Sequence, residues 1–255
     1  MEQDDQQLAH QLAEEAGRLL VDLRSGSNLE GPSLAREGDR SSHEFIVGQL
    51  RALRPEDAVV SEEDDPSSRQ WPRPSRQWLV DPLDGTREYS ERRDDFAVHV
   101  ALVIDGLAQL GAVALPGEGI VMATVSPDLT LAKRVAGPIR VMVSRTRPPA
   151  VAQAVAEHLD GELVAMGSAG AKSMAVVRGL GDVYLHAGGQ YEWDSAAPVA
   201  VAVAAGAHAS RLDGSPIRYG RRDPWLPDLV VCRPELADKV LETVAAVARE
   251  SAADQ

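Results

Sequence analysis

Three polar side chains close together in the sequence are placed to do chemistry. Asp81 and Asp84 come directly after a short apolar stretch that is typical of a buried strand. Pro82 removes a backbone donor and Gly85 permits a sharp bend, so both carboxylates and the hydroxyl of Thr86 can converge where that strand ends. Hard oxygen ligands placed in this way suit magnesium, which binds through a few carboxylates, water and substrate phosphate.

The same turn also has a structural interpretation, in which Asp84 is the N-cap of a helix, a position that Asp favours. Other acidic residues at the ends of elements favour the chemical interpretation. Glu62 ends a predicted strand, and Asp194 directly precedes a predicted helix. If these two carboxylates meet Asp81 and Asp84 in the fold, their mutual repulsion requires bound cations or raised pKa values.

Charge narrows the range of partners. The formal net charge of the 255-residue chain is -13, which argues against a nucleic-acid polymer, because neutralising its phosphates needs a basic face. An anionic small molecule is compatible with this charge if bound divalent cations reverse its sign locally. The alternative is that the acidic surface only keeps the protein soluble.

Cysteine and histidine usage argues against other metal sites. The single cysteine, Cys232, excludes an internal disulfide and a cysteine-rich zinc site, and its apolar neighbours predict a core position. The six histidines show no paired ligand spacing, so we expect them in the core or on the surface. A site built from carboxylates is the remaining prediction.

Targeting signals are not evident in the chain. Its first residues are acidic and lack the basic and then apolar order of a secretory signal. No apolar run reaches the length of a membrane span. We therefore expect a cytoplasmic protein without a membrane partner.

Apolar periodicity predicts helices followed by a meander of strands in the first half of the chain. The turn at residues 105–106, Asp-Gly between two apolar runs, predicts a hairpin. We expect helices at 5–24 and 40–53, strands at 58–61, 78–80, 96–104, 108–115, 119–125 and 129–134, and a loop at 65–76.

The second half alternates between strands and helices. We expect strands at 139–143, 163–166, 183–185, 207–210 and 229–232, and helices at 148–159, 171–179, 195–205 and 235–250. The third of these helices should begin at Asp194 or Ser195, because Pro198 lacks an amide hydrogen and is tolerated in the first turn. The pattern predicts an α+β protein with two subdomains, residues 1–136 and 137–255.

Three motifs, in this order and spacing, resemble those of the inositol monophosphatase superfamily, which comprises magnesium-dependent phosphomonoesterases. They are Ser61-Glu62-Glu63, the stretch from Asp81 to Thr86, and the stretch from Glu192 to Pro198. Residues 81–89, 143–148, 167–172 and 184–194 are similar to bacterial 3′-phosphoadenosine 5′-phosphate phosphatases of the CysQ type. The resemblance covers essentially the whole chain and implies a layered αβαβα sandwich, with an N-terminal helix-plus-antiparallel-sheet half and a C-terminal alternating half.

The resemblance also implies a role for each matching residue. Glu62, Asp81 and the backbone carbonyl of Leu83 would hold one magnesium ion, and Asp81, Asp84 and Asp194 a second, with a third at Glu62. Manganese is a possible replacement. Asp39 and Thr86, together with Glu62, would be catalytic and would orient and deprotonate the attacking water.

Two positions depart from the family pattern. Ser61 stands in place of the usual glycine, at a position that is not a ligand. Arg36 stands where a threonine often precedes the aspartate that corresponds to Asp39, which weakens the assignment of Asp39.

Substrate contacts are expected around the same motifs. Gly85 and Thr86 would offer backbone amides to a phosphate. Arg145, Arg147 and Lys172 are candidates for a second phosphate, and a solubilising surface is their alternative role. The full predicted set is Leu83, Asp84, Gly85, Thr86, Arg145, Arg147, Ser168, Lys172 and Asp194.

The predicted activity is magnesium-dependent removal of the 3′-phosphate from adenosine 3′,5′-bisphosphate, with its 5′-phosphosulfate relative as a further candidate substrate. This reaction would recycle a by-product of sulfate activation, and the resemblance implies inhibition by lithium. One alternative keeps the chemistry but takes inositol 1-phosphate or fructose 1,6-bisphosphate. Another is a non-catalytic protein that binds nucleotide or metal. The resemblance is compatible with a monomer or a homodimer.

Overall fold

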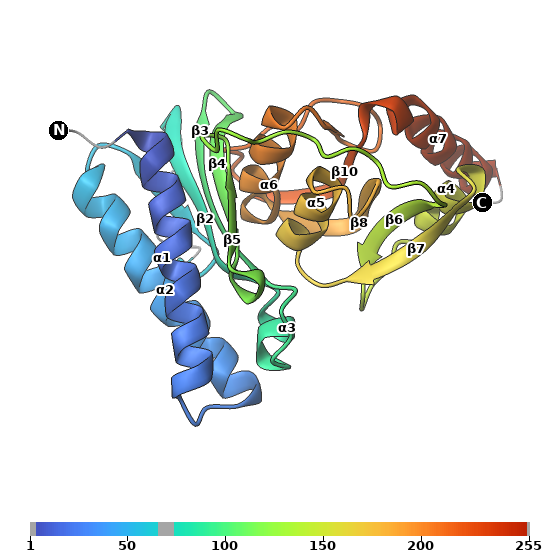
Figure 1. The fold of residues 1–255 in the computed structure, drawn as a ribbon. Coiled ribbons are helices and arrows are strands. Elements are labelled where there is room, and N and C mark those ends of the chain that lie inside the picture. The colour runs from blue at the N-terminus through green and yellow to red at the C-terminus, as the bar shows by residue number, and fades with distance from the viewer. Residues whose placement is uncertain (1–3, 66–73, 254–255) are drawn as a thin grey trace.

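Helices and sheets alternate in five layers in a computed structural model that describes residues 4–65 and 74–253. Figure 1 shows these layers from left to right. The first helical layer is α1 (Asp5–Gly26) and α2 (Gly31–Leu53), the middle one α5 (Ala169–Val177) and α6 (Glu192–Ala204), and the last one α4 (Val151–His158) and α7 (Ala237–Ala253). The predicted α+β fold with αβαβα layers is therefore confirmed. Residues 66–73 of the predicted loop lie outside the described residues.

The first layer differs from the prediction at the start of α2. This helix begins at Gly31 rather than at residue 40, with Pro32 in its first turn, where a missing amide hydrogen costs little. Gly38 does not break the helix. A Cβ there would lie 2.8 Å from Tyr89 Cε1, so the glycine allows α2 to pack closely on the segment after β2. Asp39 consequently lies inside α2 and not before it, contrary to the sequence prediction.

The first sheet has the strand order β1-β2-β3-β4-β5, in which β1 and β2 are parallel and the other pairs antiparallel. Its strands are β1 (Ala58–Ser61), β2 (Arg76–Asp84), β3 (Ala97–Ile104), β4 (Leu107–Leu115) and β5 (Ile120–Ala123), with the 3₁₀ turn η2 (Pro116–Glu118) before β5. β2 does not end at residue 80 but continues to Asp84. Its register against β3 shifts between Asp81 and Asp84, so Pro82 sits in an irregularity where no ladder hydrogen bond is needed.

The strand predicted at 129–134 is wrong. This segment runs past the ends of the middle helices instead of joining the sheet. The amide of Leu131 donates to the carbonyl of Ala205 at 2.8 Å, and the amide of Ala132 donates to that of Val177 at 2.8 Å. The last carbonyls of a helix have no hydrogen-bond partner within the helix. Here they accept from the amides of Leu131 and Ala132, which in a strand would donate to a neighbouring strand.

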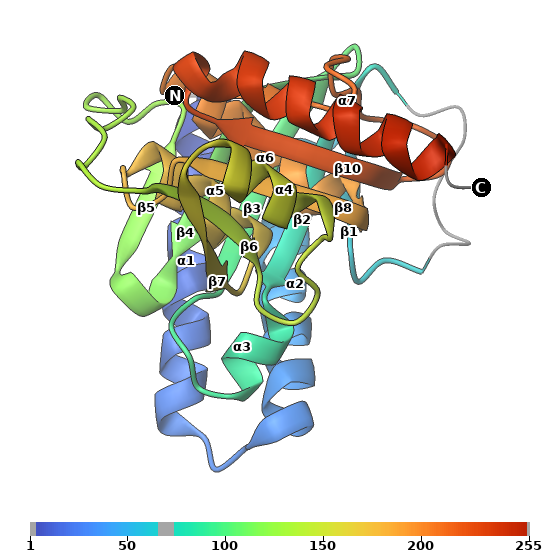
Figure 2. The same ribbon diagram turned by 90° about the vertical axis from the view of Figure 1, so that its right-hand side faces the viewer.

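The second sheet has the order β7-β6-β8-β10-β9, with β6 parallel to β7 and β8. Its strands are β6 (Ile139–Ser144), β7 (Gly161–Met166), β8 (Val183–Tyr191), β9 (His208–Ser210) and β10 (Trp225–Cys232), and the turn η3 (Pro234–Leu236) precedes α7. Figure 2 shows α7 lying across β10. β8 extends further than predicted, to Tyr191, and its end leads directly into α6.

The start of α6 also differs from the prediction. Tyr191 is the N-cap, so Asp194 lies in the first turn and Pro198 lies inside the helix, beyond the turn expected for it. The peptide unit at Pro198 lacks the amide hydrogen that the carbonyl four residues earlier would accept. α6 packs tightly on β4, since a Cβ at Gly111 would lie 2.8 Å from Ala197 Cα. This packing, rather than local propensity, holds the proline within the helix.

Candidate metal and phosphate site

Three carboxylates from two different layers meet in the fold. Asp81 and Asp84 lie at the end of β2, and Asp194 lies in the first turn of α6. One oxygen from each carboxylate lies within 4.8 Å of the other two. Residues that are far apart in the sequence thus form one compact set of oxygen donors of the kind that hard cations prefer.

Asp81 provides the test of whether such a cation fits. Its side chain is fully buried, and its Oδ1 accepts a hydrogen bond from the amide of Leu83 at 3.1 Å. Its Oδ2 has no hydrogen-bond partner among the described residues. A buried carboxylate oxygen without a donor is costly, and a cation would remove that cost. The carboxylates therefore fit a divalent ion.

Asp84 is held from three directions. Its Oδ2 accepts hydrogen bonds from Ser168 Oγ at 2.5 Å and from the amide of Gly170 at 2.8 Å, both at the start of α5. The ring Nε2 of His99 lies 3.3 Å from the same oxygen. The other ring nitrogen, Nδ1, lies 3.2 Å from the carbonyl of Trp193. Asp84 thus joins β2, β3, α5 and α6 at one point.

His99 is the site residue that sequence reasoning missed, because it was considered only as a core or surface histidine. It is fully buried in β3 and pairs in register with Asp81. The signal was present in the predicted hairpin, since an antiparallel strand that follows the carboxylate turn must place some residue opposite it. The polar residue in that apolar strand is His99.

Burial and mutual repulsion change the acidity of the cluster. Burial, followed by the charges of Glu62 and Asp84, raises the pKa of Asp81. Burial and the charge of Asp84 raise the pKa of Glu62 to about 7 and that of Asp194 to about 7. Burial also opposes ionisation of Asp84, but the adjacent ring of His99, the charge of Lys172 and the hydrogen bond from Ser168 outweigh it and lower its pKa to about 2. A cation would displace protons that the other acids retain.

Asp39 lies near this cluster without sharing its cavity. Its side chain is buried in the middle of α2. Burial, and then the charges of Glu63 and Glu62, raise its pKa to about 8. A carboxylate with a raised pKa is a better proton acceptor than an exposed one, which is the property that a general base needs.

Thr86 follows a turn that requires glycine. Gly85 has a φ of +90°, in the left-handed region, and a Cβ there would lie 3.3 Å from the carbonyl oxygen of Asp95. The short helix α3 (Thr86–Ser90) begins at the next residue and lies below the sheets in Figures 1 and 2. The hydroxyl of Thr86 donates to the carbonyl of Leu83 at 3.1 Å. Its lone pairs stay available to accept a hydrogen bond from a ligand.

A cavity of about 560 Å³ opens on the carboxylates. Asp84 and Asp194 line one part of it, together with Gly85 and Thr86. Of the remaining residues predicted to bind substrate, Arg147, Ser168 and Lys172 line the cavity, and Leu83 and Arg145 do not. The predicted ligands Asp81 and Glu62 and the predicted base Asp39 also lie outside its lining.

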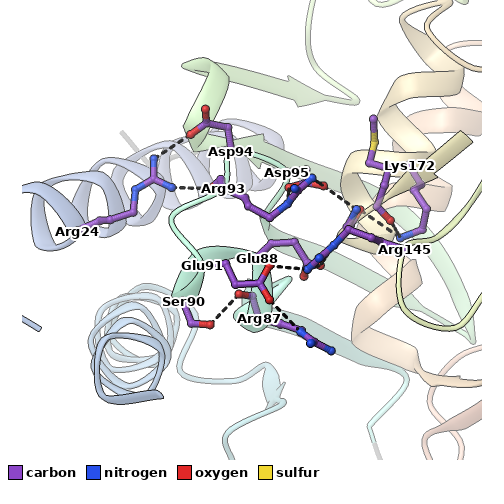
Figure 3. Close-up of polar contacts among 12 residues, drawn as sticks. Arg24, Arg87, Glu88, Ser90, Glu91, Arg93, Asp94, Asp95, Arg145 and Lys172 are labelled. Atoms are coloured by element: carbon purple, nitrogen blue, oxygen red, sulfur yellow. Dashed lines mark hydrogen bonds and ion pairs between the residues drawn. The ribbon is translucent and has the colours of Figure 1, made fainter. Parts of the chain in front are cut away.

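The two predicted arginines have different surroundings. Figure 3 shows the guanidinium of Arg145 directed at two carboxylates, that of Glu88 in α3 and that of Glu91 directly after it. Its Nη2 lies 2.9 Å from Glu88 Oε1 and 2.7 Å from Glu91 Oε2. Glu88 is buried, so this pair links the end of β6 to α3. The guanidinium of Arg147, in contrast, has no hydrogen bond or ion pair with any of the described residues and lines the cavity.

Lys172 is largely committed to the protein. It is buried, and its Nζ donates to the carbonyls of Met166, Gly167 and Ser168. The ammonium also lies 5.2 Å from the centre of the Tyr184 ring. Lys172 thus braces the loop that leads into α5 while it places a positive charge beside the cavity.

The same loop is anchored to the first half of the chain. The amide of Gly167 donates to Asp95 Oδ2 at 2.8 Å, and Arg93 holds that carboxylate through Nε at 2.7 Å. A Cβ at Gly167 would lie 2.2 Å from Glu88 Cγ, so only glycine allows this approach. The loop that supplies Ser168 to Asp84 is therefore fixed between the two sheets.

These features define a protein with a carboxylate cluster beside a cavity large enough for a small ligand, between two layered sheets. Comparison with protein families identifies the class, since the model of the inositol monophosphatase family matches residues 3–251. The chain belongs to the inositol monophosphatase family. The family resemblance inferred from the motifs is confirmed.

Curated relatives narrow the comparison. The chain is 48% identical over 242 residues to a 3′-phosphoadenosine 5′-phosphate phosphatase of Mycobacterium tuberculosis, covering 91% of this chain and 90% of the relative. It is 32% identical to the 3′(2′),5′-bisphosphate nucleotidase CysQ of Escherichia coli, covering 85% and 94%. Among solved structures it is similar to CysQ from Bacteroides thetaiotaomicron, with a TM-score of 0.78 and 24% identity over 90% and 97% of the two chains.

A search of the helices within residues 4–65 and 74–253 finds none with the length and hydrophobicity of a membrane span.

Proposed function

We propose that this chain is a magnesium-dependent phosphomonoesterase that removes the 3′-phosphate from adenosine 3′,5′-bisphosphate, giving AMP and phosphate. The observation that carries the proposal is the carboxylate cluster of Asp81, Asp84 and Asp194 at a cavity that Arg147 and Lys172 also line. The relatives that carry this activity in their names support the choice of substrate. The 5′-phosphosulfate relative of the substrate would give adenosine 5′-phosphosulfate by the same reaction.

The cluster would hold two or three magnesium ions, or manganese in their place. Asp81, Asp84 and Asp194 would be the ligands of one ion, and Asp81, Glu62 and the carbonyl of Leu83, as the family resemblance implies, those of another. When bound, such ions activate water, hold the phosphoryl oxygens and stabilise the leaving oxygen. His99, Ser168 and Gly170 contribute by fixing the orientation of Asp84 before any ion arrives.

The chain's own residues handle the water and its proton. Thr86 is tied to the Leu83 carbonyl, so its oxygen presents lone pairs to a water molecule in a fixed direction. Asp39 and Glu62 are buried acids with raised pKa values, so their ionised forms, which a bound cation would favour, are suited to accept the proton that the attacking water loses. Gly85 and Thr86 offer amides to the phosphate at the turn between β2 and α3.

The second phosphate of the substrate needs cations away from the carboxylates. Arg147 is the candidate whose guanidinium on the cavity wall has no partner among the described residues. Lys172, bonded to the loop before α5, adds a second positive charge to the wall. Arg145 would first have to leave Glu88 and Glu91. On this proposal the enzyme acts on small phosphomonoesters in the cytoplasm, as a monomer or homodimer, and lithium inhibits it by competing at a metal position.

Phosphate release from a panel of substrates tests the proposal. We expect the highest kcat/KM for adenosine 3′,5′-bisphosphate, against inositol 1-phosphate and fructose 1,6-bisphosphate, with full dependence on added magnesium. Full activity in excess chelator would refute the metal-dependent mechanism. A clear preference for inositol 1-phosphate would refute the substrate, and tight nucleotide binding without turnover would indicate a non-catalytic protein.

A further inference from the structure

One face of α2 contacts both strand ends that carry the proposed ligands Asp81 and Glu62. Ser42 and His43 follow Asp39 by three and four positions, so the three side chains lie on the same face of the helix. Asp39 has a proposed role as a base, whereas the other two have no role in the site described so far. Their contacts lie directly beside the two ligands.

Ser42 acts on the peptide unit between Pro82 and Leu83. Its side chain is fully buried, and its Oγ donates to the carbonyl of Pro82 at 2.8 Å. The amide of the same peptide unit, that of Leu83, donates to Asp81 Oδ1 at 3.1 Å. A peptide unit is planar and trans, so its carbonyl and its amide point in opposite directions. By fixing the carbonyl, Ser42 therefore also fixes the amide that orients Asp81.

His43 acts on the end of β1. A hydrogen bond of 2.9 Å joins its Nδ1 to Oγ of Ser61, which is fully buried and directly precedes Glu62. The amide of Ser61 donates to Asp64 Oδ2 at 2.7 Å, and the amide of Glu62 donates to a carbonyl of β2 at 3.1 Å. A glycine at position 61, as in the family pattern, could not make the bond to His43. The serine thus ties the residue before Glu62 to α2.

We propose that Ser42 and His43 are positioning residues that hold the carboxylates of Asp81 and Glu62 in place before an ion binds. The inference rests on the proposed function, in which these two carboxylates share one ion. Both contacts come from adjacent residues of one 23-residue helix, so a rigid element rather than two separate loops sets the distance between the strand ends. Partners that orient a metal ligand in this way typically change metal affinity by about 10–100-fold.

The affinity of the substrate-free protein for Mn²⁺ tests the first contact, with free Mn²⁺ measured by electron paramagnetic resonance. Ser42→Ala removes the hydroxyl that holds the Pro82 carbonyl, so we expect the Kd for Mn²⁺ to rise by about tenfold or more. Ser41→Ala is the matched control, because its hydroxyl bonds Glu37 within α2, and its Kd should be unchanged. An unchanged Kd in Ser42→Ala overturns the proposal.

A double-mutant cycle tests the second contact. His43→Ala should raise the Kd for Mn²⁺ by about tenfold in the chain with Ser61. In Ser61→Ala the hydrogen bond is already absent, so the same substitution at His43 should have no further effect. An equal rise in both backgrounds would mean that His43 does not act through Ser61, and this part of the proposal would be wrong.

Two further measurements separate positioning from stability. If Ser42 and His43 only stabilise the fold, their alanine variants should lose Tm in chelator and keep the Kd for Mn²⁺, which refutes positioning. If they position the ligands, the magnesium concentration for half-maximal phosphate release should rise by about tenfold, with a much smaller loss of kcat at saturating magnesium. An unmodified chain that binds no Mn²⁺ refutes the proposed function itself, whereas tight binding that neither variant weakens refutes only this inference.

Discussion

The carboxylate end of the cavity and its cationic wall differ in how far the protein satisfies its own charges. At the carboxylate end, Asp81 keeps a buried oxygen without a donor, and burial and repulsion raise the pKa values of its neighbours. On the wall, Lys172 bonds three carbonyls, and Arg145, which lies outside the cavity lining, is paired with two carboxylates. The carboxylates thus lack partners that a bound ligand could supply, whereas two of the three cationic side chains, Lys172 and Arg145, already have partners within the protein. Charge alone therefore does not identify a binding residue; unsatisfied charge does.

The largest effect should come from the carboxylate end. Asp84→Asn removes a ligand oxygen that three neighbours orient. Loss of residues that only support a metal ligand typically costs 10–100-fold, so we expect a loss of more than about 100-fold in kcat/KM for magnesium-dependent phosphate release. Asp128→Asn, at an exposed position in the turn after β5, is the matched control. Equal activity of the two variants would show that the cluster is structural.

The raised pKa values of these buried acids predict an unusual pH dependence of stability in the absence of metal. Glu62 and Asp194, with pKa values of about 7, and Asp39, with a pKa of about 8, bind protons in the folded state that the unfolded chain has already lost. Because the folded state holds more protons, the free energy of unfolding falls as pH rises from about 4 toward these raised values.

Thermal unfolding at pH 5.5 and 8.5 checks this sign. In chelator we expect the Tm to be lower at pH 8.5, by roughly 5 °C or more if the loss is about 2 kcal/mol. Added magnesium should reduce that difference, because a cation stabilises the ionised carboxylates. A Tm that rises with pH in chelator would mean that the acids are not protonated in the folded protein.

On the cationic wall, Arg147→Ala should act on substrate affinity. A hydrogen bond to a charged group contributes about 1.5–3 kcal/mol, so we expect KM for adenosine 3′,5′-bisphosphate to rise by roughly tenfold to hundredfold. The rise should be much smaller for adenosine 3′-monophosphate, which lacks the 5′-phosphate. Arg249→Ala, on the exposed face of α7, controls for the loss of one positive charge. Equal effects on both substrates would assign Arg147 to the reacting phosphate.

Arg145→Ala should act on stability, and by less. The substitution leaves the buried Glu88 without its cation, which is expected to cost about 1–3 kcal/mol in the free energy of unfolding. Denaturant unfolding measures this cost, and Glu88→Gln in the same background should recover part of it by removing the unpaired charge. A large rise in KM for the bisphosphate with unchanged stability would instead indicate that Arg145 binds the substrate.

The short motifs were the part of the site that could be predicted from sequence. The stretch from Asp81 to Thr86 places its functional groups by local geometry, and Gly85 has the positive φ that the bend requires. The pattern of elements predicted an α+β protein, and the layer order that the family resemblance implied was also correct. Asp39 was misplaced because the second helix was expected to begin at residue 40, whereas α2 begins at Gly31 and packs closely on Tyr89 at Gly38. The segment 129–134 was wrong because its donors meet helix ends.

The sequence by itself determined the kinds of ligand atom, the family and the order of layers, because these depend on residue type and on neighbours within a few positions. Only the tertiary structure decided which polar groups are satisfied. It brought His99 to Asp84, committed Arg145 to Glu88, and tied Ser42 to the carbonyl of Pro82. Partners in these cases come from elements distant in the chain, and whether a buried polar group is paired depends on what packs around it and not on its own identity.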